Sequence, residues 1–299
     1  MNTTPEDELN VHIQEEEFKE EFEVKQGRLY PTFTDLAAIF GVFIVSQLGA
    51  VFASMLIVKL FSEPLTTDLR MAWTMLIAQI ISMAITVIFI SFLRRRRGAE
   101  PPVLRFSIKG FNPTVLLGGL LMIVSMSVVL EPILSLLPSV PDVEGRGWPM
   151  LVALVLVAPI FEEIICRGMI YESLRLKSGI VVACLVSSLF FGLMHLHPAM
   201  IVNAFFMGLI LCYIYIRSRS LIASMILHAL NNALAYILIL LDMGENVMLK
   251  DLITNQNIYY VVYAVAVLVL IISIVICSRQ FKKIVAQQEG VDSQEEDNF

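Results

Sequence analysis

Residues 148–167 read WPMLVALVLVAPIFEEIICR, and this stretch decides the class of the fold. No residue from Trp148 to Phe161 is charged, and Glu162 and Glu163 follow directly. A helix needs about 20 mostly apolar residues to cross the hydrocarbon core of a bilayer. We therefore predict a transmembrane helix with two carboxylates at membrane depth, where ionisable residues are costly and typical of functional sites.

The composition of the whole chain agrees with this interpretation. Of its 299 residues 57% are hydrophobic and only 16% are charged, and the mean hydropathy is +0.77. Soluble domains have about 45–50% apolar and about 25% charged residues. The net charge of −6 and the lack of a basic face argue against a nucleic-acid partner. The four cysteines form no CxxC pair, so we predict neither a disulfide framework nor a thiolate metal site.

Apolar segments of spanning length recur along the chain, and we predict an all-α polytopic membrane protein with about eight transmembrane helices. The predicted spans are Leu36–Leu60, Met71–Leu93, Val115–Leu137, Trp148 to a point between 165 and 176, Ile180–His197, Ala199–Ile216, Leu221–Leu241 and Ile258–Cys277.

These spans divide the chain into five segments. The ends, 1–30 and 284–299, are acidic tails too polar to form a core, and we expect them to be solvated or disordered. Three N-terminal transmembrane helices occupy 31–147, the helical core with the polar motifs occupies 148–241, and the last transmembrane helix lies in 242–283.

The distribution of Lys and Arg predicts the orientation, because these residues concentrate in cytoplasmic loops. Of 21 basic residues, only Lys59, Arg70, Arg146 and Lys250 fall on one side of the predicted spans. All others, including Arg94–Arg97, fall on the other side. We therefore predict a multi-pass protein with both termini in the cytoplasm, surrounded by membrane lipid.

The helical positions of the two glutamates suggest different roles. Neighbouring residues point about 100° apart, whereas residues four apart share a face. Glu163 is therefore predicted to pair with Arg167, which leaves the carboxylate of Glu162 free for chemistry. If the fourth helix continues to Leu176, Glu162 lies about 21 Å from its inner end, within the bilayer. We prefer this long helix, because a helix ending near residue 165 would separate Glu162 from the histidines.

Three of the four histidines also lie in the membrane region. Phe191 and His195 share one helix face, as do His228 and Asn232. His197 precedes Pro198, and we expect it to act in a cap or turn. Two further polar residues have structural interpretations: Asn231 as a hydrogen bond between helices, and Glu131 as a residue near the outer interface.

The segments FEEIICR (161–167), FFGLMH (190–195) and HALNN (228–232) resemble the EExxxR, FxxxH and HxxxN motifs of the CPBP family, the CAAX-protease and bacteriocin-processing intramembrane proteases. The order of the motifs and their placement on successive apolar segments also match. The resemblance covers roughly residues 148–241 and implies an endopeptidase. Its substrate would be a membrane-associated peptide or protein, and a prenylated CAAX terminus is the best-known type.

The chemistry of amide hydrolysis suggests a role for each motif residue, because the reaction needs an activated water and a stabilised oxyanion. Glu162 is the predicted general base, and His195 helps to hold the water. His228 and Asn232 are the predicted oxyanion donors. Glu163, Arg167 and Phe191 would support the site.

Three alternatives stay open at this stage. Glu162, His195 and His228 are a possible zinc ligand set, although their spacing is not HExxH; we favour a protease without a cofactor. A proton-coupled transporter would use the same residues as a relay, but its ionisable residues would be spread over two repeated halves. A non-catalytic membrane scaffold or immunity protein would tolerate the loss of a motif residue, and none is lost.

Overall fold

The computed structural model describes residues 30–61, 65–102, 104–108, 112–138, 145–241 and 248–296, with the side chains of 251 and 281–296 excepted. All of its regular structure in these ranges is helical. The elements are α2 (Phe33–Val58), α3 (Thr67–Arg96), α4 (Pro113–Leu134), α5 (Trp148–Val152), η1 (Ala153–Val157), α6 (Ala158–Glu163), η2 (Ile164–Tyr171), α7 (Glu172–Leu193), α8 (Pro198–Ser218), α9 (Leu221–Leu240), α10 (Leu249–Leu252) and α11 (Gln256–Glu296). The prediction of an all-α polytopic fold is confirmed.

Helix starts coincide with capping residues in the sequence. The Thr32 hydroxyl accepts from the Asp35 N–H, and the Asp35 carboxylate accepts from the Thr32 N–H, which makes a capping box at α2. Ser220 caps α9 in the same way through the N–H of Ala223. His197 occupies the N-cap position of α8, before Pro198, but its side chain makes no capping hydrogen bond.

Within the described ranges, seven helices are long and apolar enough to cross a membrane. One of them, Trp148–Leu193, has 46 residues and contains the fourth and fifth predicted spans. The backbone breaks at Gly179, whose φ of 79° lies in the left-handed region that glycine adopts without strain. The count of seven treats Trp148–Leu193 as one helix, whereas the prediction of eight divides it into two spans near this turn. The long fourth helix is confirmed, because helical structure continues past Leu176.

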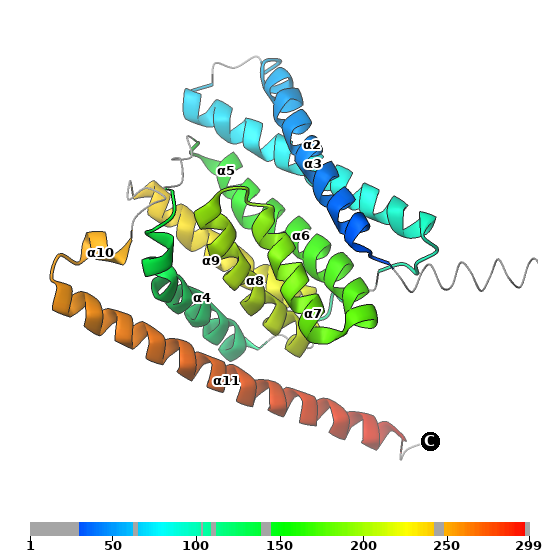
Figure 1. The fold of residues 1–299 in the computed structure, drawn as a ribbon, viewed down its shortest axis with the longest axis vertical. Coiled ribbons are helices and arrows are strands. Elements are labelled where there is room, and N and C mark those ends of the chain that lie inside the picture. Colours follow the sequence, from blue (N-terminus) through cyan, green and yellow to red (C-terminus); the bar gives the residue numbers. More distant parts are fainter. Residues whose placement is uncertain are drawn as a thin grey trace, which may run out of the picture.

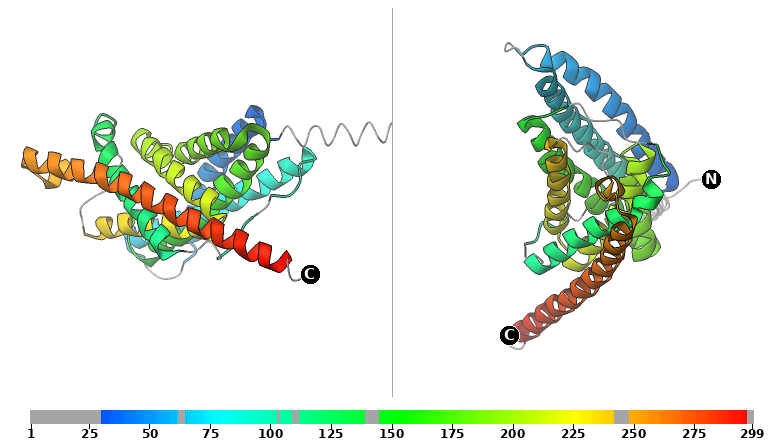
Figure 2. Two further views of the ribbon diagram at one scale, coloured as in Figure 1. Left: turned by 90° about the horizontal axis from the view of Figure 1, so that it is seen from below. Right: turned by 90° about the vertical axis from the view of Figure 1, so that its left-hand side faces the viewer.

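The helices form a bundle with the motif-bearing segments at its centre (Figure 1). The α2–α3 pair lies along one edge, and α11 lies along α4 at the opposite edge. Between them, α5, η1 and α6 pack against α3, η1 and α6 also pack against α9, and α7 packs against α8. The C-terminal part of α11 extends beyond the other helices (Figure 2). The described part of the predicted C-terminal tail is thus helical as far as Glu296, while 1–29 lies outside the described residues.

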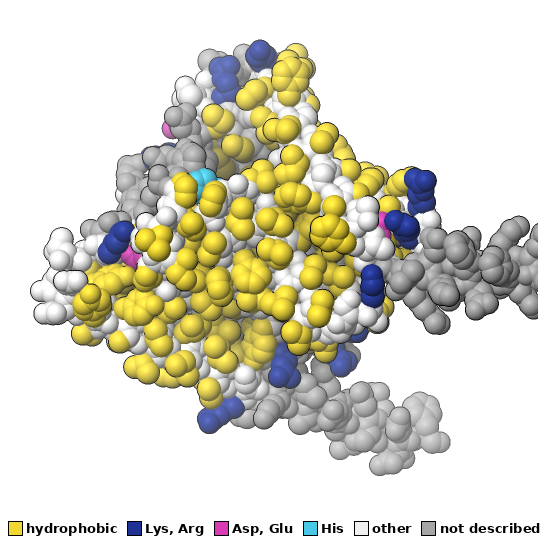
Figure 3. Space-filling model, viewed as in Figure 1, with side chains coloured by type: hydrophobic (Ala, Val, Ile, Leu, Met, Phe, Trp, Pro, Cys, Tyr) yellow, Lys and Arg dark blue, Asp and Glu magenta, His cyan; other side chains and the backbone are white. Residues whose placement is uncertain are grey.

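Hydrophobic side chains cover most of the face that Figure 3 shows, and Lys and Arg gather near its margins. The spanning helices expose large apolar side chains, such as those of Val45 and Val181, which are each 71% exposed. A water-soluble monomer rarely exposes such continuous apolar area. With seven spanning candidates, this surface identifies an integral membrane protein in a lipid environment.

A buried polar cluster holds the end of the motif-bearing helix that leads into the Gly179 turn. The Glu172 carboxylate accepts a hydrogen bond from the Tyr215 hydroxyl at 2.6 Å and pairs with Arg175 at 2.6 Å. Arg105 lies 3.8 Å from the same carboxylate. These contacts connect the start of α7 to α8 and to the loop before α4.

Candidate active site

The two glutamates lie on a single α-helical turn between two π-helical segments, η1 and η2. In η1 the N–H of Ala158 donates to the carbonyl of Ala153, five residues back. In the same register, the donor for the carbonyl of Leu154 would be the nitrogen of Pro159, but a proline nitrogen carries no hydrogen. The distortion therefore has an identifiable cause, and it releases one backbone acceptor. Such π-helical turns occur frequently at functional sites.

Glu163 and Arg167 form the ion pair that their spacing predicts. Arg167 Nη1 lies 2.8 Å from Glu163 Oε1, and both side chains are fully buried. Arg167 Nη2 donates to the carbonyl of Gly208 on α8 at 2.8 Å, and its guanidinium carbon lies 4.8 Å from the centre of the Phe191 ring. One guanidinium thus connects η2 with α6, α7 and α8.

Gly208 makes this connection possible by its lack of a side chain. A Cβ atom there would lie 3.1 Å from the Ser188 Cβ and 3.2 Å from the Phe191 Cδ1. These are tighter than ordinary van der Waals contacts. The glycine therefore allows α7 and α8 to approach closely enough for the Gly208 carbonyl to reach Arg167.

His228 lies between the two glutamates. Its Nδ1 is 3.3 Å from Glu163 Oε1, and its Nε2 is 3.8 Å from Glu162 Oε2. One ring therefore contacts both carboxylates. They do point apart, but an imidazole has nitrogens on two sides, and a single ring from α9 reaches both.

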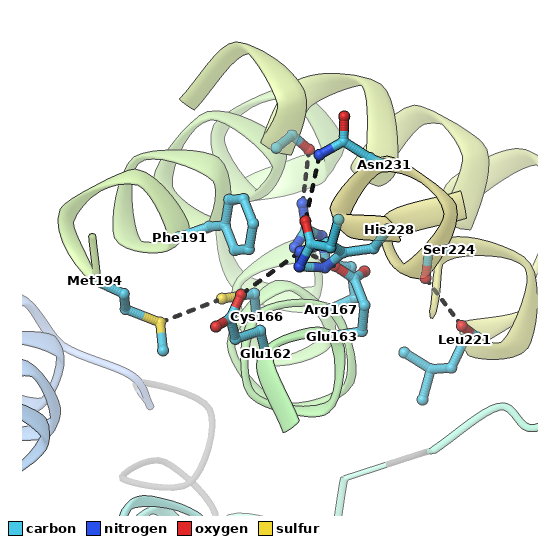
Figure 4. Close-up of polar contacts among 12 residues, drawn as sticks. Glu162, Glu163, Cys166, Arg167, Phe191, Met194, Leu221, Ser224, His228 and Asn231 are labelled. Atoms are coloured by element: carbon cyan, nitrogen blue, oxygen red, sulfur yellow. Dashed lines mark hydrogen bonds and ion pairs between the residues drawn. The ribbon is translucent and has the colours of Figure 1, made fainter. Parts of the chain in front are cut away.

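Glu162 is the less constrained of the two. In the described part of the chain no Lys or Arg pairs with its carboxylate, which instead lies beside His228. Its side chain retains 10% of its exposure, whereas that of Glu163 has none. Glu162, Phe191 and His228 come from three helices and point toward one another (Figure 4). A sulfur contact of 3.9 Å between Cys166 and Met194 lies beside the Glu162 carboxylate.

Phe191 packs against both motif histidines. Its ring centre lies 5.2 Å from that of His195 and 5.4 Å from that of His228, and both pairs meet edge to face. His195 Nδ1 lies 3.0 Å from the carbonyl of Phe191. A carbonyl only accepts, so Nδ1 carries the hydrogen, and Nε2 of the neutral ring offers a lone pair.

Asn232, rather than Asn231, makes a hydrogen bond to another helix. Its Nδ2 donates to the Leu154 carbonyl in η1 at 2.9 Å, the acceptor that Pro159 leaves without a partner. Asn231 instead donates to Asn232 Oδ1 at 3.3 Å, within its own helix. The prediction of a helix–helix hydrogen bond for Asn231 is therefore wrong. The rotation of α9 decides which asparagine faces η1, and the sequence does not contain that rotation.

Two residues near the site have no place in the sequence-based prediction. Tyr236 lies one helical turn after Asn232, and its hydroxyl bonds to the backbone of Gly147. The spacing of four from His228 to Asn232 to Tyr236 was a usable signal, since such residues share a helix face. Gly208, the second, has no signal in the sequence that separates it from other glycines in spans.

Glu131 accepts a hydrogen bond from the Lys250 N–H at 2.8 Å, a structural contact away from the site.

The possible zinc ligands do not converge as the structure stands. A carboxylate and two imidazoles are suitable donors for zinc. Among the described residues, however, no three His, Cys, Asp or Glu side chains are arranged to hold a metal ion. Both His195 and His228 pack edge to face against the Phe191 ring. We therefore derive no step through a metal.

Comparison with known proteins gives one match. Residues 144–234 match the family model described as Rce1-like, type II CAAX prenyl endopeptidase. No curated protein and no solved structure matches this chain. The matched region begins just before α5 and ends within α9, so it contains all three motifs.

Proposed function

Through residues 144–234 this chain belongs to the CPBP family of CAAX-type intramembrane proteases, and we propose that it hydrolyses a peptide bond with a water molecule activated by Glu162. The observation that carries the proposal is the buried Glu162 carboxylate beside His228, backed by the fully buried Glu163–Arg167 pair. A protease of this kind acts on a membrane-associated protein substrate.

The distance between Glu162 and His228 suits a bridging water. At 3.8 Å, Oε2 and Nε2 are too far apart for a direct hydrogen bond, but one water can bond to both. His195 Nε2, with its lone pair, would accept a further hydrogen bond from this water. Glu162 then takes a proton while the water oxygen attacks the scissile carbonyl carbon.

The attack moves an electron pair onto the carbonyl oxygen, and this oxyanion needs donors. His228 supplies an N–H on the side of Glu162. Asn232 has a second amide hydrogen besides the one bonded to Leu154, and Asn231 fixes the orientation of the amide through Oδ1. When the intermediate collapses, the C–N bond breaks and Glu162 returns its proton to the leaving amine.

The Glu163–Arg167 pair supports this chemistry without taking part in proton transfer. Glu163 Oε1 contacts both Arg167 and His228, so it orients the imidazole. Arg167 in turn fixes Phe191, which packs against both histidines. Positioning of this kind matters because small displacements of reacting groups cost large factors in rate.

For the substrate we propose a prenylated protein with a C-terminal CAAX sequence, since the matching family model is described by that activity. For the topology we propose that both termini are cytoplasmic. Both proposals rest on the family and on the distribution of basic residues rather than on the geometry of the site.

The test is cleavage of fluorogenic peptides, prenylated and plain, by purified protein in detergent. The Glu162→Gln variant keeps the size of the side chain but removes the base, and we expect kcat/KM to fall by about 10²–10⁴-fold. Glu131→Gln is the matched control, because Glu131 is another buried glutamate in a spanning helix, bonded to a backbone N–H. Activity that survives in Glu162→Gln would refute the mechanism.

A zinc chelator added to the wild type tests the cofactor prediction in the same assay. Retained activity supports a protease without a metal, whereas loss that zinc restores would support the zinc-dependent alternative. A wild type that is folded but cleaves no peptide of either kind would favour the non-catalytic alternative.

A further inference from the structure

A third polar residue of α9 bonds to the helix that carries the glutamates. The Tyr236 hydroxyl donates to the Gly147 carbonyl at 2.9 Å and accepts from the Gly147 N–H at 3.0 Å. Tyr236 is 3% exposed, and its ring belongs to an apolar cluster with Ala72, Met150 and Leu154. Both functions of the hydroxyl are therefore used by a single backbone residue.

Gly147 is the N-cap of α5, where the motif-bearing helix begins. Its φ of 111° is available to glycine but strained for other residues, and no side chain caps the helix there. The Gly147 carbonyl also accepts from the Leu151 N–H in the first turn. Tyr236 thus fastens the residue at which the helix starts to α9.

The contact belongs to a series along one face of α9. His228 meets Glu162 and Glu163, and Asn232, four residues later, meets the Leu154 carbonyl in η1. Tyr236, four residues further, meets Gly147. The two outer contacts bracket η1, the segment whose register determines which way Glu162 points relative to α9.

We propose that Tyr236 is a positioning residue, which fixes the start of the bent helix against α9 and thereby holds Glu162 in register with His228. It acts through Gly147 and η1, and it touches no reacting atom. This inference rests on the proposed function for its catalytic consequence, but not for its structural one.

Tyr236→Phe removes only the hydroxyl and keeps the ring in its apolar cluster. We expect kcat to fall about 10–100-fold, because a displacement of about 1 Å at reacting groups can cost 10²-fold, while KM changes less than about twofold. Tyr263→Phe is the matched control. Tyr263 also donates to a backbone carbonyl, that of Val129 at 3.2 Å, but it joins α11 to α4 away from the site.

The two variants separate positioning from general stability. Tyr236→Phe loses two hydrogen bonds to Gly147 and Tyr263→Phe loses one to Val129, so small decreases in Tm are expected for both, the larger for Tyr236→Phe. Only Tyr236→Phe should lower kcat. Equal kcat values for the two variants, or a change in KM alone, would overturn the proposal.

Hydrogen–deuterium exchange of the full-length protein gives a readout that needs no substrate. In Tyr236→Phe, amides of residues 147–157 should exchange about tenfold faster, and in Tyr263→Phe they should exchange as in the wild type. If the wild type cleaves nothing, the proposed function fails while this measurement still decides the structural claim. Unchanged exchange over 147–157 in Tyr236→Phe would refute it.

Discussion

Replacement of Arg167 by Met is the perturbation with the largest expected effect on this protein. Arg167 is fully buried and makes three contacts: the ion pair with Glu163, the hydrogen bond to the Gly208 carbonyl and the stacking on Phe191. Methionine fills part of the volume but replaces none of the polar contacts. The Glu163 carboxylate would be left at zero exposure without its cation.

The expected cost follows from this uncompensated charge. Removing one partner of a buried ion pair destabilises proteins by about 3–5 kcal/mol. For chains of this size, 1 kcal/mol corresponds to a shift in Tm of about 2–4 °C. Arg167→Met should therefore lower Tm by about 6–20 °C.

Arg97 offers a matched control within the same chain. Its pair with Asp35 has the same 2.8 Å separation, but the Arg97 side chain is 37% exposed, and Asp35, at 3%, keeps the N–H and hydroxyl of Thr32 as donors. Ion pairs that water can reach contribute about 0–1 kcal/mol. Arg97→Met should lower Tm by no more than about 4 °C.

The free cysteines provide the assay. Cys166, Cys212 and Cys277 are fully buried, so a thiol-reactive fluorophore labels them as the protein unfolds in detergent. Tm is read from the rise in fluorescence for wild type, Arg167→Met, Arg97→Met and the double variant Glu163→Gln/Arg167→Met. The double variant should lie above Arg167→Met, because it no longer buries an unpaired carboxylate. Equal shifts for the two single arginine variants would refute the reasoning.

Two further predictions concern packing and topology. Gly208→Ala should lower Tm by about 2–12 °C through overpacking of about 1–3 kcal/mol against Ser188 and Phe191. Gly41→Ala, where a Cβ atom meets nothing within 4 Å, should leave Tm unchanged or raise it slightly; the same fluorescence assay measures both. Reporter tags at the two termini should be accessible from the same side, the cytoplasm, in protease-protection experiments on oriented vesicles. Tags on opposite faces would contradict the proposed topology.

The features that follow from spacing along one helix could be predicted from the sequence. Glu163 and Arg167 are four residues apart, and no tertiary information was needed to pair them. The spans could be located because bilayer thickness sets a length that apolar segments either reach or do not. The turn at Gly179 separates two predicted spans for the same reason, since a span ends where a polar stretch and a glycine interrupt it.

Contacts between helices were beyond the reach of the same reasoning. The position of His228 between two glutamates depends on how α9 is rotated and how deep it lies against α6. At 1.5 Å per residue, His228 lies about 10 Å from the predicted inner end of its helix, whereas Glu162 lies about 21 Å from the end of its own. The 3.8 Å contact between Glu162 and His228 shows that the fold absorbs this difference, and hydropathy does not specify how.

Pro159 has one consequence that the sequence predicts and one that only the fold shows. Its missing N–H is evident from the sequence, and it implies that some carbonyl of the preceding turn lacks a partner. Only the fold shows that the carbonyl is that of Leu154 and that Asn232 supplies the donor. In a membrane, where water is scarce, an unsatisfied backbone carbonyl costs several kcal/mol, so a bend of this kind requires a polar partner on a neighbouring helix. The polar face of α9 therefore has two physical reasons to exist, the chemistry at Glu162 and the backbone of the helix that carries it, and substitutions on this face should affect both.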